Sequence, residues 1–228
     1  MNIDILLQPA LSALATLAAA FSGARYAFHL QGQAQARRPV EDRVAAGNRA
    51  IFVLIRQFNT LKTFQTQIID PVRDDPGAFL NIRASLPFSY DSLTVDFDSL
   101  SFLLETNHRQ VLGELFIEEE RFRSAIQAIN ERWRIHLNIC QPLLEGVGII
   151  EGGEYTPEQI QAALGHCLVL QLKRAMDAVV QHVDKTVESS LAVGEKLYTV
   201  QKSLFPKHSI IRFEPDTRQI PNLTKACN

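Results

Sequence analysis

One pair of residues in this 228-residue sequence has the spacing of a metal-binding motif. Glu105 and His108 are three residues apart, which places both side chains on one face of a helix. Two copies of such an E-x-x-H pair, together with further glutamates, build di-iron sites in helical bundles. Because this sequence holds a single copy, we interpret the pair as a solvated helix start and expect neither a metal ion nor a cofactor.

A second pair, Arg132 and His136, resembles the Arg-x4-6-His motif of HEPN ribonucleases, which are also helical. The resemblance implies an arginine that stabilises a phosphodiester and a histidine that transfers protons. The three intervening residues depart from the family's spacing, and Arg25 to His29 repeats the same misfit. An arginine on the helix surface beside a core Trp133 is the preferred interpretation, so a ribonuclease is the last of our hypotheses and we expect no enzyme.

Other signatures of covalent or phosphate chemistry are missing from the sequence, which has no glycine-rich phosphate loop, no H-E-x-x-H and no G-x-S-x-G. His166 and Cys167 are adjacent but have no nearby acid to orient a base, which favours a buried pair over a nucleophile. The run Glu118–Glu120 is interpreted as a solvated helix face, in which Glu119 pairs with Arg123 one helical turn away.

The composition is that of a folded protein with no preference for nucleic acid. Hydrophobic residues make up 46% of the chain, and 23 basic residues balance 25 acidic ones to give a net charge of -2. A dedicated nucleic-acid binder carries a basic excess, so no nucleic-acid partner is expected. The three cysteines are odd in number and far apart, which is untypical of a disulfide framework.

The N-terminal region contains 20 consecutive residues without a charge, from Ile5 to Ala24. As a helix this run would be about 30 Å long, which matches the hydrocarbon core of a bilayer. We predict a transmembrane anchor over residues 1–30 that contacts the lipid bilayer. A cleaved signal peptide and a buried helix are the alternatives, but a signal peptide needs a positive start and here only Asp4 precedes the run.

Basic residues after the uncharged run set the expected orientation. Arg25, Arg37 and Arg38 follow it closely, and positive flanks stay in the cytoplasm. We therefore expect a bacterial inner-membrane protein whose N-terminus lies outside and whose remaining chain lies in the cytoplasm.

The predicted anchor has one face of small and polar residues at helical spacing. Its members are Gln8, Ser12, Ala15, Thr16, Ala19 and Gly23. Small residues let helix backbones approach closely, which favours association of anchors or a face turned to a pore. Chance spacing in an alanine-rich helix is an equally good explanation. Since one helix cannot enclose a channel, an ion channel would require a homo-oligomer.

The remaining chain is predicted to be all-α, with an elongated antiparallel bundle of long helices over residues 31–206 and a C-terminal tail over 207–228. Apolar periodicity predicts long helices over 40–69, 107–140 and 157–205. Their length is typical of a long bundle or a coiled-coil arm.

Local signals refine these boundaries. Asp70-Pro71 is expected to end the first of the three helices. A short helix is expected at Asp98–Glu105, after a long loop. Thr156, followed by a proline and then by Gln159, has the pattern of a capping box at the start of the last helix.

Two stretches, Val95–Glu105 and Leu112–Phe122, resemble segments of uncharacterised bacterial proteins with one N-terminal membrane helix. The resemblance implies a location and a plan but no activity. The plan is also similar to that of small membrane effectors in bacterial antiphage operons.

Three functional hypotheses follow. The first is a non-enzymatic membrane protein whose cytosolic helices sense a protein or a small ligand and act on the membrane, in its strongest form as a pore. The second is a membrane-tethered scaffold for another protein, and the third is the helical ribonuclease.

Overall fold

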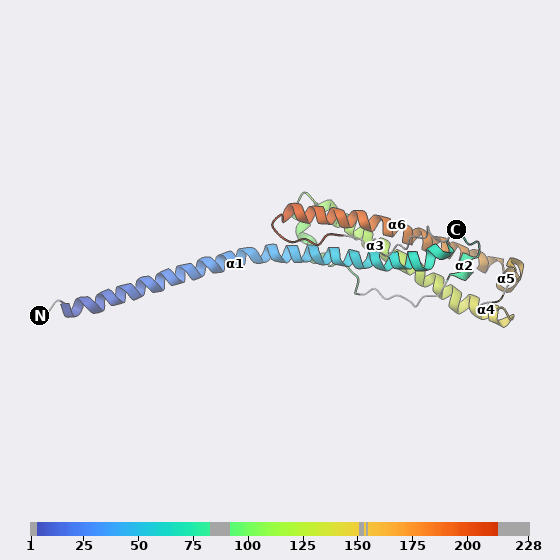
Figure 1. Ribbon diagram of the computed structural model, residues 1–228, viewed down its shortest axis with the longest axis horizontal. Coiled ribbons are helices and arrows are strands. Elements are labelled where there is room, and N and C mark those ends of the chain that lie inside the picture. Colours follow the sequence, from blue (N-terminus) through green and yellow to red (C-terminus); the bar gives the residue numbers. More distant parts are fainter. Residues whose placement is uncertain (1–3, 83–91, 151–152, 154, 214–228) are drawn as a thin grey trace, which may run out of the picture. The chain divides into compact units, whose positions relative to one another are not determined.

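The computed structural model describes residues 4–82, 92–150, 153 and 155–213 (Figure 1). Within the first helix, the side chains of residues 4–20, 22, 24, 30 and 32–37 lie outside the description. Every regular element in the described part is a helix, and several are long. The all-α prediction is therefore confirmed there.

The chain divides into two compact units, residues 1–45 and residues 46–228. Helix α1 (Asp4–Phe64) contributes residues to both units. We expected a new helix to begin after Pro39, but α1 continues through this residue. A proline removes one backbone hydrogen bond from a helix interior and need not end the helix when the turns on both sides persist.

The predicted transmembrane helix over residues 1–30 is not found. In the part of the chain that the structure describes, no helix has a stretch long and apolar enough to cross a bilayer. Within the uncharged run, side chains are described only at Phe21 and Gly23.

Three long helices build the second unit: the C-terminal part of α1, α3 (Arg109–Ile135) and α6 (His166–Leu204). On α1, Gly47 lies against Gln201 of α6, and Gln65 just after α1 donates to Asp184 of α6 at 2.7 Å. Early residues of one helix thus meet late residues of the other, so α1 and α6 are antiparallel.

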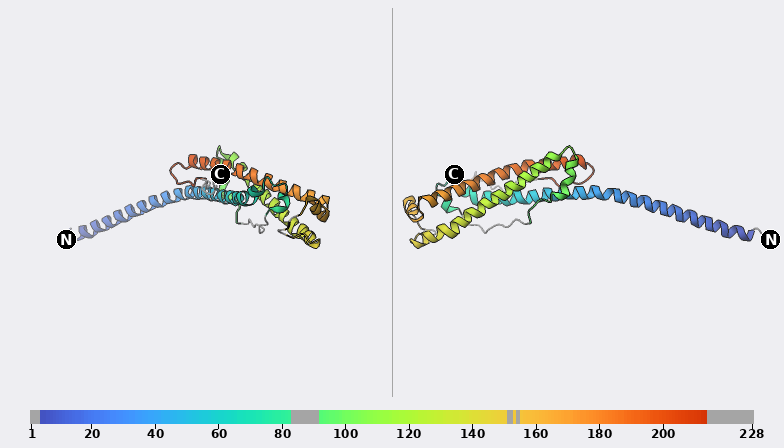
Figure 2. Two further views of the ribbon diagram at one scale, coloured as in Figure 1. Left: turned by 45° about the vertical axis from the view of Figure 1, so that its right-hand side comes forward. Right: turned by 180° about the vertical axis from the view of Figure 1, so that it is seen from behind.

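The same reasoning gives the direction of α3. Glu114 pairs with Lys196, whereas Glu118 accepts a hydrogen bond from Ser189. Helix α3 is therefore also antiparallel to α6 and must run parallel to α1, as the two views in Figure 2 show. The antiparallel arrangement that we predicted holds for α6 but is wrong for α3.

A long connection between α1 and α3 explains the parallel pair, because it returns the chain to the starting end of the bundle. Its described elements are η1 (Gln65–Ile69), η2 (Asp70–Val72), α2 (Ala78–Asn81) and η3 (Asp98–Glu105). The first is a π-helical turn, and η2 and η3 are 3-10 helices. The short helix predicted at residues 98–105 is present in this tighter form.

At its C-terminal end α3 continues through a π-helical turn, η4 (His136–Cys140), into α4 (Gln141–Gly146). The capping box at Thr156 is confirmed at the start of α5 (Pro157–Leu164), where the backbone N–H of Gln159 donates to Thr156 Oγ1 at 3.3 Å. The single helix expected over 157–205 is wrong, because Gly165 separates α5 from α6 with a φ of +76°.

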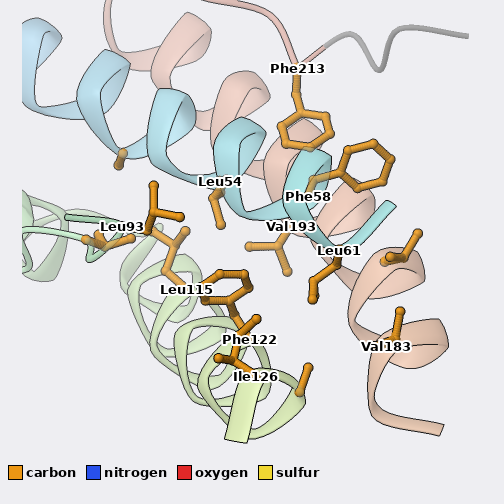
Figure 3. Packing of buried hydrophobic residues seen from close by; sticks show 14 of the residues in the cluster. Leu54, Phe58, Leu61, Leu93, Leu115, Phe122, Ile126, Val183, Val193 and Phe213 are labelled. Carbon is orange, nitrogen blue, oxygen red and sulfur yellow. The ribbon is translucent and has the colours of Figure 1, made fainter. Parts of the chain in front are cut away.

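Buried apolar side chains of α1, α3 and α6 meet along the bundle axis (Figure 3). The labelled members are Leu54, Phe58, Leu61, Leu93, Leu115, Phe122, Ile126, Val183, Val193 and Phe213. Full burial of one such side chain contributes about 1.5–3 kcal/mol. Phe213 belongs to the predicted tail yet is only 5% exposed. Its ring packs edge-on against the ring of Phe58, with 5.5 Å between the ring centres, so the described start of the tail covers the core.

Candidate functional site

Arg132, near the C-terminal end of α3, has the most unusual environment of any charged residue in the described part of the chain. Only 1% of the residue is exposed. Its Nη2 donates to the backbone carbonyl of Phe79 in α2 at 2.8 Å, and its guanidinium carbon lies 4.3 Å from the ring centre of Trp133. A long charged side chain is almost never fully buried unless it is paired.

No acidic residue among those described pairs with this guanidinium. Among the same described residues, its Nε and Nη1 have no hydrogen-bond partner, and neither do the indole Nε1 of Trp133 and Nδ1 of His136. One turn of helix thus holds several buried polar atoms without a partner. Leaving a buried charge without its partner typically costs about 3–5 kcal/mol. The turn therefore lacks acceptors.

The charge on Arg132 persists at neutral pH. Burial lowers the pKa of Arg132 to about 10, which leaves the guanidinium protonated. Burial, together with the charge of Arg132, lowers the pKa of His136 to about 4, so that imidazole is neutral. Burial also raises the pKa of the Cys140 thiol, which stays protonated. The three groups together carry one positive charge.

The backbone explains how these groups come together. Residues 132, 136 and 140 are four apart, which keeps them near one face of a helix. The last two bound the π-helical turn η4, and such turns are rare and frequently mark functional sites.

The surroundings of the turn are apolar. Ile135, Cys140, Leu164 and Leu172 form a second, smaller core cluster against which Phe79 and Leu80 of α2 pack. The side chain of Lys173 on α6 is exposed, and its ammonium lies 5.1 Å from the ring centre of Phe79. We name the segment Arg132–Cys140, together with Phe79 and this cluster, the Arg132 site.

The geometry suits binding better than proton transfer. A buried cation and unpartnered hydrogen-bond donors offset the cost of burying an anion. The Arg132–His136 pair that suggested a ribonuclease does lie on one face, but Arg132 is buried, so our expectation of an arginine on the helix surface is wrong. An acid–base role for His136 stays a prediction.

Buried glutamates in the middle of α3 form a different kind of cluster, because they have partners. Gln57 of α1 donates to Glu119 at 2.9 Å and to the carbonyl of Leu93 at 2.7 Å. Ser189 donates to Glu118 at 2.9 Å. We expected residues 118–120 to form a solvated face, which is wrong for the first two, since Glu118 is 1% and Glu119 4% exposed.

Part of that expectation holds. Glu119 pairs with Arg123 at 3.6 Å, the one-turn spacing that we predicted. Glu120 is exposed and pairs with the same arginine at 3.0 Å. The partners of the buried glutamates link the three long helices, so we assign this cluster a structural role.

The E-x-x-H pair and the His166–Cys167 pair do not form a site in the described part of the chain. Within the described residues, no group of three or more histidine, cysteine or acidic side chains could hold a metal ion, and this includes the surroundings of Glu105 and His108. Cys167 is exposed rather than part of a buried pair with His166.

The structure does not describe most side chains of the predicted anchor face. These residues are Gln8, Ser12, Ala15, Thr16 and Ala19, together with Arg37 of the basic flank. Gly23, Arg25 and Arg38 are described and exposed. A Cβ added at Gly23 would meet no atom within 4 Å.

The sequence contains a signal for the Arg132 site that motif spacing alone does not reveal. Phe122, Ala125, Ile129 and Trp133 are buried at helical spacing, and Arg132 falls within the same face. An arginine at a core position of an amphipathic pattern indicates a buried charge.

Comparison with protein-family models, with curated proteins and with solved structures finds no match for this chain.

Proposed function

We propose that this chain is a non-enzymatic sensor attached to the bacterial inner membrane. In this proposal, residues 46–228 bind a small ligand or a partner protein in the cytoplasm, and α1 carries the response to the membrane. Attachment would depend on residues 1–30, with the N-terminus outside. The observation that carries the proposal is the continuity of α1 from Asp4 to Phe64.

That continuity matters because of what the helix contains. Its first part is the uncharged run from Ile5 to Ala24, and its last part carries the core residues Ile51, Leu54 and Phe58. A change in the packing of the bundle and a change in the membrane segment would therefore act on one helix. The Arg132 site supplies a place where a ligand could change that packing.

Exposed apolar residues support the homo-oligomer. Several large hydrophobic side chains of α1, η3 and α3 are more than half exposed, among them Phe52, Leu104, Phe116 and Ile117. Contact with a second copy would remove them from water. In the pore form of the proposal, the Gln8-to-Gly23 faces of several anchors would line a channel, in the manner of an antiphage effector.

Flotation of the full-length protein with lipid vesicles tests the attachment. The wild type is expected to float, and the double variant Leu11→Asp/Leu14→Asp is expected to stay at the bottom, because charges in the middle of a membrane helix are costly. Gln31→Asp/Gln33→Asp adds the same charge outside the uncharged run and should float like the wild type. A wild-type chain that stays with the water-soluble fraction would refute the proposal.

The scaffold remains the second candidate, and exchange of the anchor distinguishes it. Replacing residues 5–24 by an unrelated membrane helix removes the small and polar face of the predicted anchor. The exchange should abolish any effect on membrane potential if that face acts on the membrane. A scaffold would keep its function after the exchange.

A further inference from the structure

The most unusual feature of the bundle is the Arg132 site, where a buried cation meets no acidic side chain in the part of the chain that the structure describes. We infer that this site binds a monocarboxylate with a short apolar tail. The inference deepens the proposed function by naming the class of small ligand. It does not require attachment to a membrane, so the two can fail separately.

The turn that holds Arg132 has a deficit of hydrogen-bond acceptors. Of its polar groups, the Arg132 Nε and Nη1 and the Trp133 Nε1 are donors, and all are buried without a partner. His136 Nδ1 is also buried and unpartnered, and a neutral imidazole can carry its proton there. A carboxylate offers two oxygens and only accepts, so it supplies what the turn lacks.

The charge of the site favours a monoanion. Among the described residues, the Arg132 guanidinium has the backbone carbonyl of Phe79 as its sole hydrogen-bond acceptor. Because His136 and Cys140 are neutral and the ammonium of Lys173 is exposed to solvent, one negative charge balances the buried groups. A dianion such as sulfate would leave an excess charge in apolar surroundings, which is unfavourable.

The side chains around the turn favour an apolar remainder of the ligand. Ile135, Leu164 and Leu172 are buried in the cluster beside the turn, and Phe79 and Leu80 of α2 cover it. These side chains favour a hydrocarbon tail over a polar one. The four-residue helix α2 (Ala78–Asn81) holds the Phe79 carbonyl, so a ligand on Arg132 would act on the connection that follows α1.

Thermal unfolding of the full-length protein with hexanoate tests the inference. Hexanamide has the same tail but no charge, and sulfate has charge but no tail. Hexanoate is expected to raise the midpoint of unfolding more than hexanamide or sulfate at equal concentration. Equal effects of hexanoate and hexanamide, or a larger effect of sulfate, would overturn the proposal.

Two variants locate the site. Arg132→Met should lose the difference between hexanoate and hexanamide, which corresponds to an affinity at least about tenfold weaker for a lost charge-assisted contact. Arg134→Met is the matched control, because Arg134 is exposed and pairs with Glu131 on the surface. A difference that persists in Arg132→Met would place the binding elsewhere and refute the assignment.

A second measurement serves if Arg132→Met does not fold. In a Cys167→Ser/Cys227→Ser background, buried Cys140 reacts with a maleimide only when the structure opens. Ligand bound to the closed state slows this reaction by a factor of about two when its concentration equals the dissociation constant. Hexanoate should slow the labelling and hexanamide should not, whereas identical rates would contradict the inference.

Discussion

Gly194 of α6 lies against the ring of Phe213, so closely that an added Cβ would be 2.6 Å from the ring Cδ2. The ring also packs edge-on against Phe58 of α1 at 5.5 Å. The chain segment after α6 therefore closes the core between α1 and α6. Asn48 holds the same segment through hydrogen bonds to the Ser209 carbonyl at 3.2 Å and the Ile211 amide at 2.9 Å.

The first prediction follows from this contact. Gly194→Ala forces the Phe213 ring to move and should destabilise the fold by about 1–3 kcal/mol, the usual cost of overpacking. Gly113→Ala is the matched control, because Gly113 is an exposed helical glycine with no atom within 4 Å of an added Cβ. That change should stabilise by about 0.5–1 kcal/mol. Urea unfolding measures both, and equal stabilisation by the two would show that Phe213 does not occupy this position.

The break between α5 and α6 gives the second prediction. Gly165 has a φ of +76°, which residues with a side chain rarely adopt, although nothing surrounds its Cβ position. Gly165→Ala should therefore cost about 1–3 kcal/mol through backbone strain alone. Gly146→Ala, where space is also open and φ is not positive, should change stability little. A Gly165→Ala protein as stable as the wild type would contradict the positive φ at this position.

The third prediction concerns the pH dependence of stability. Burial raises the pKa of Glu118 above its usual range, opposed by hydrogen bonds from Ser189 and Arg121. A carboxyl whose pKa is higher in the folded state binds protons more tightly there than in the unfolded state. Its charged form therefore lowers the free energy of unfolding above the folded pKa, and this loss disappears as the pH falls and the carboxyl becomes protonated. Glu118→Gln should therefore be more stable than the wild type at about pH 7.5, with a smaller advantage at about pH 5.

Urea unfolding at the two pH values gives the comparison. Glu120→Gln, at an exposed neighbouring position, is the control and should show no such trend. If the stability of Glu118→Gln relative to the wild type grew as the pH fell, the partners of Glu118 would stabilise its carboxylate. That result would contradict a raised pKa for Glu118.

The fourth prediction concerns Arg132 without added ligand. Arg132→Met removes a buried charge at the cost of one hydrogen bond to Phe79, so it should raise the free energy of unfolding by about 1 kcal/mol or more. Arg134→Met changes an exposed residue and should stay within about 0.5 kcal/mol of the wild type. A binding site kept at the expense of stability is a common trade-off. An Arg132→Met protein less stable than the wild type would indicate that the charge already has a partner.

How far the sequence predicts this structure depends on whether the signal is local. The capping box at Thr156 is a local signal, and the structure has it. The predicted end at Asp70-Pro71 is wrong in detail, because α1 ends at Phe64 and the helical turns η1 and η2 continue through Pro71 to Val72. The direction of α3 is not local, because it depends on the path of the connection between Gln65 and His108. The burial of Glu118 depends on which face α6 covers, whereas Arg132 falls within the apolar face of α3 and its burial can be read from that pattern.

The proposed location of the protein can be tested directly through one thiol. Cys167 is exposed, whereas Cys140 is buried, so a membrane-impermeant maleimide in a Cys227→Ser variant reports the position of the bundle. We expect labelling of Cys167 in inverted inner-membrane vesicles and none in intact spheroplasts. Labelling in spheroplasts, or recovery of the protein apart from the membranes, would contradict the proposed location.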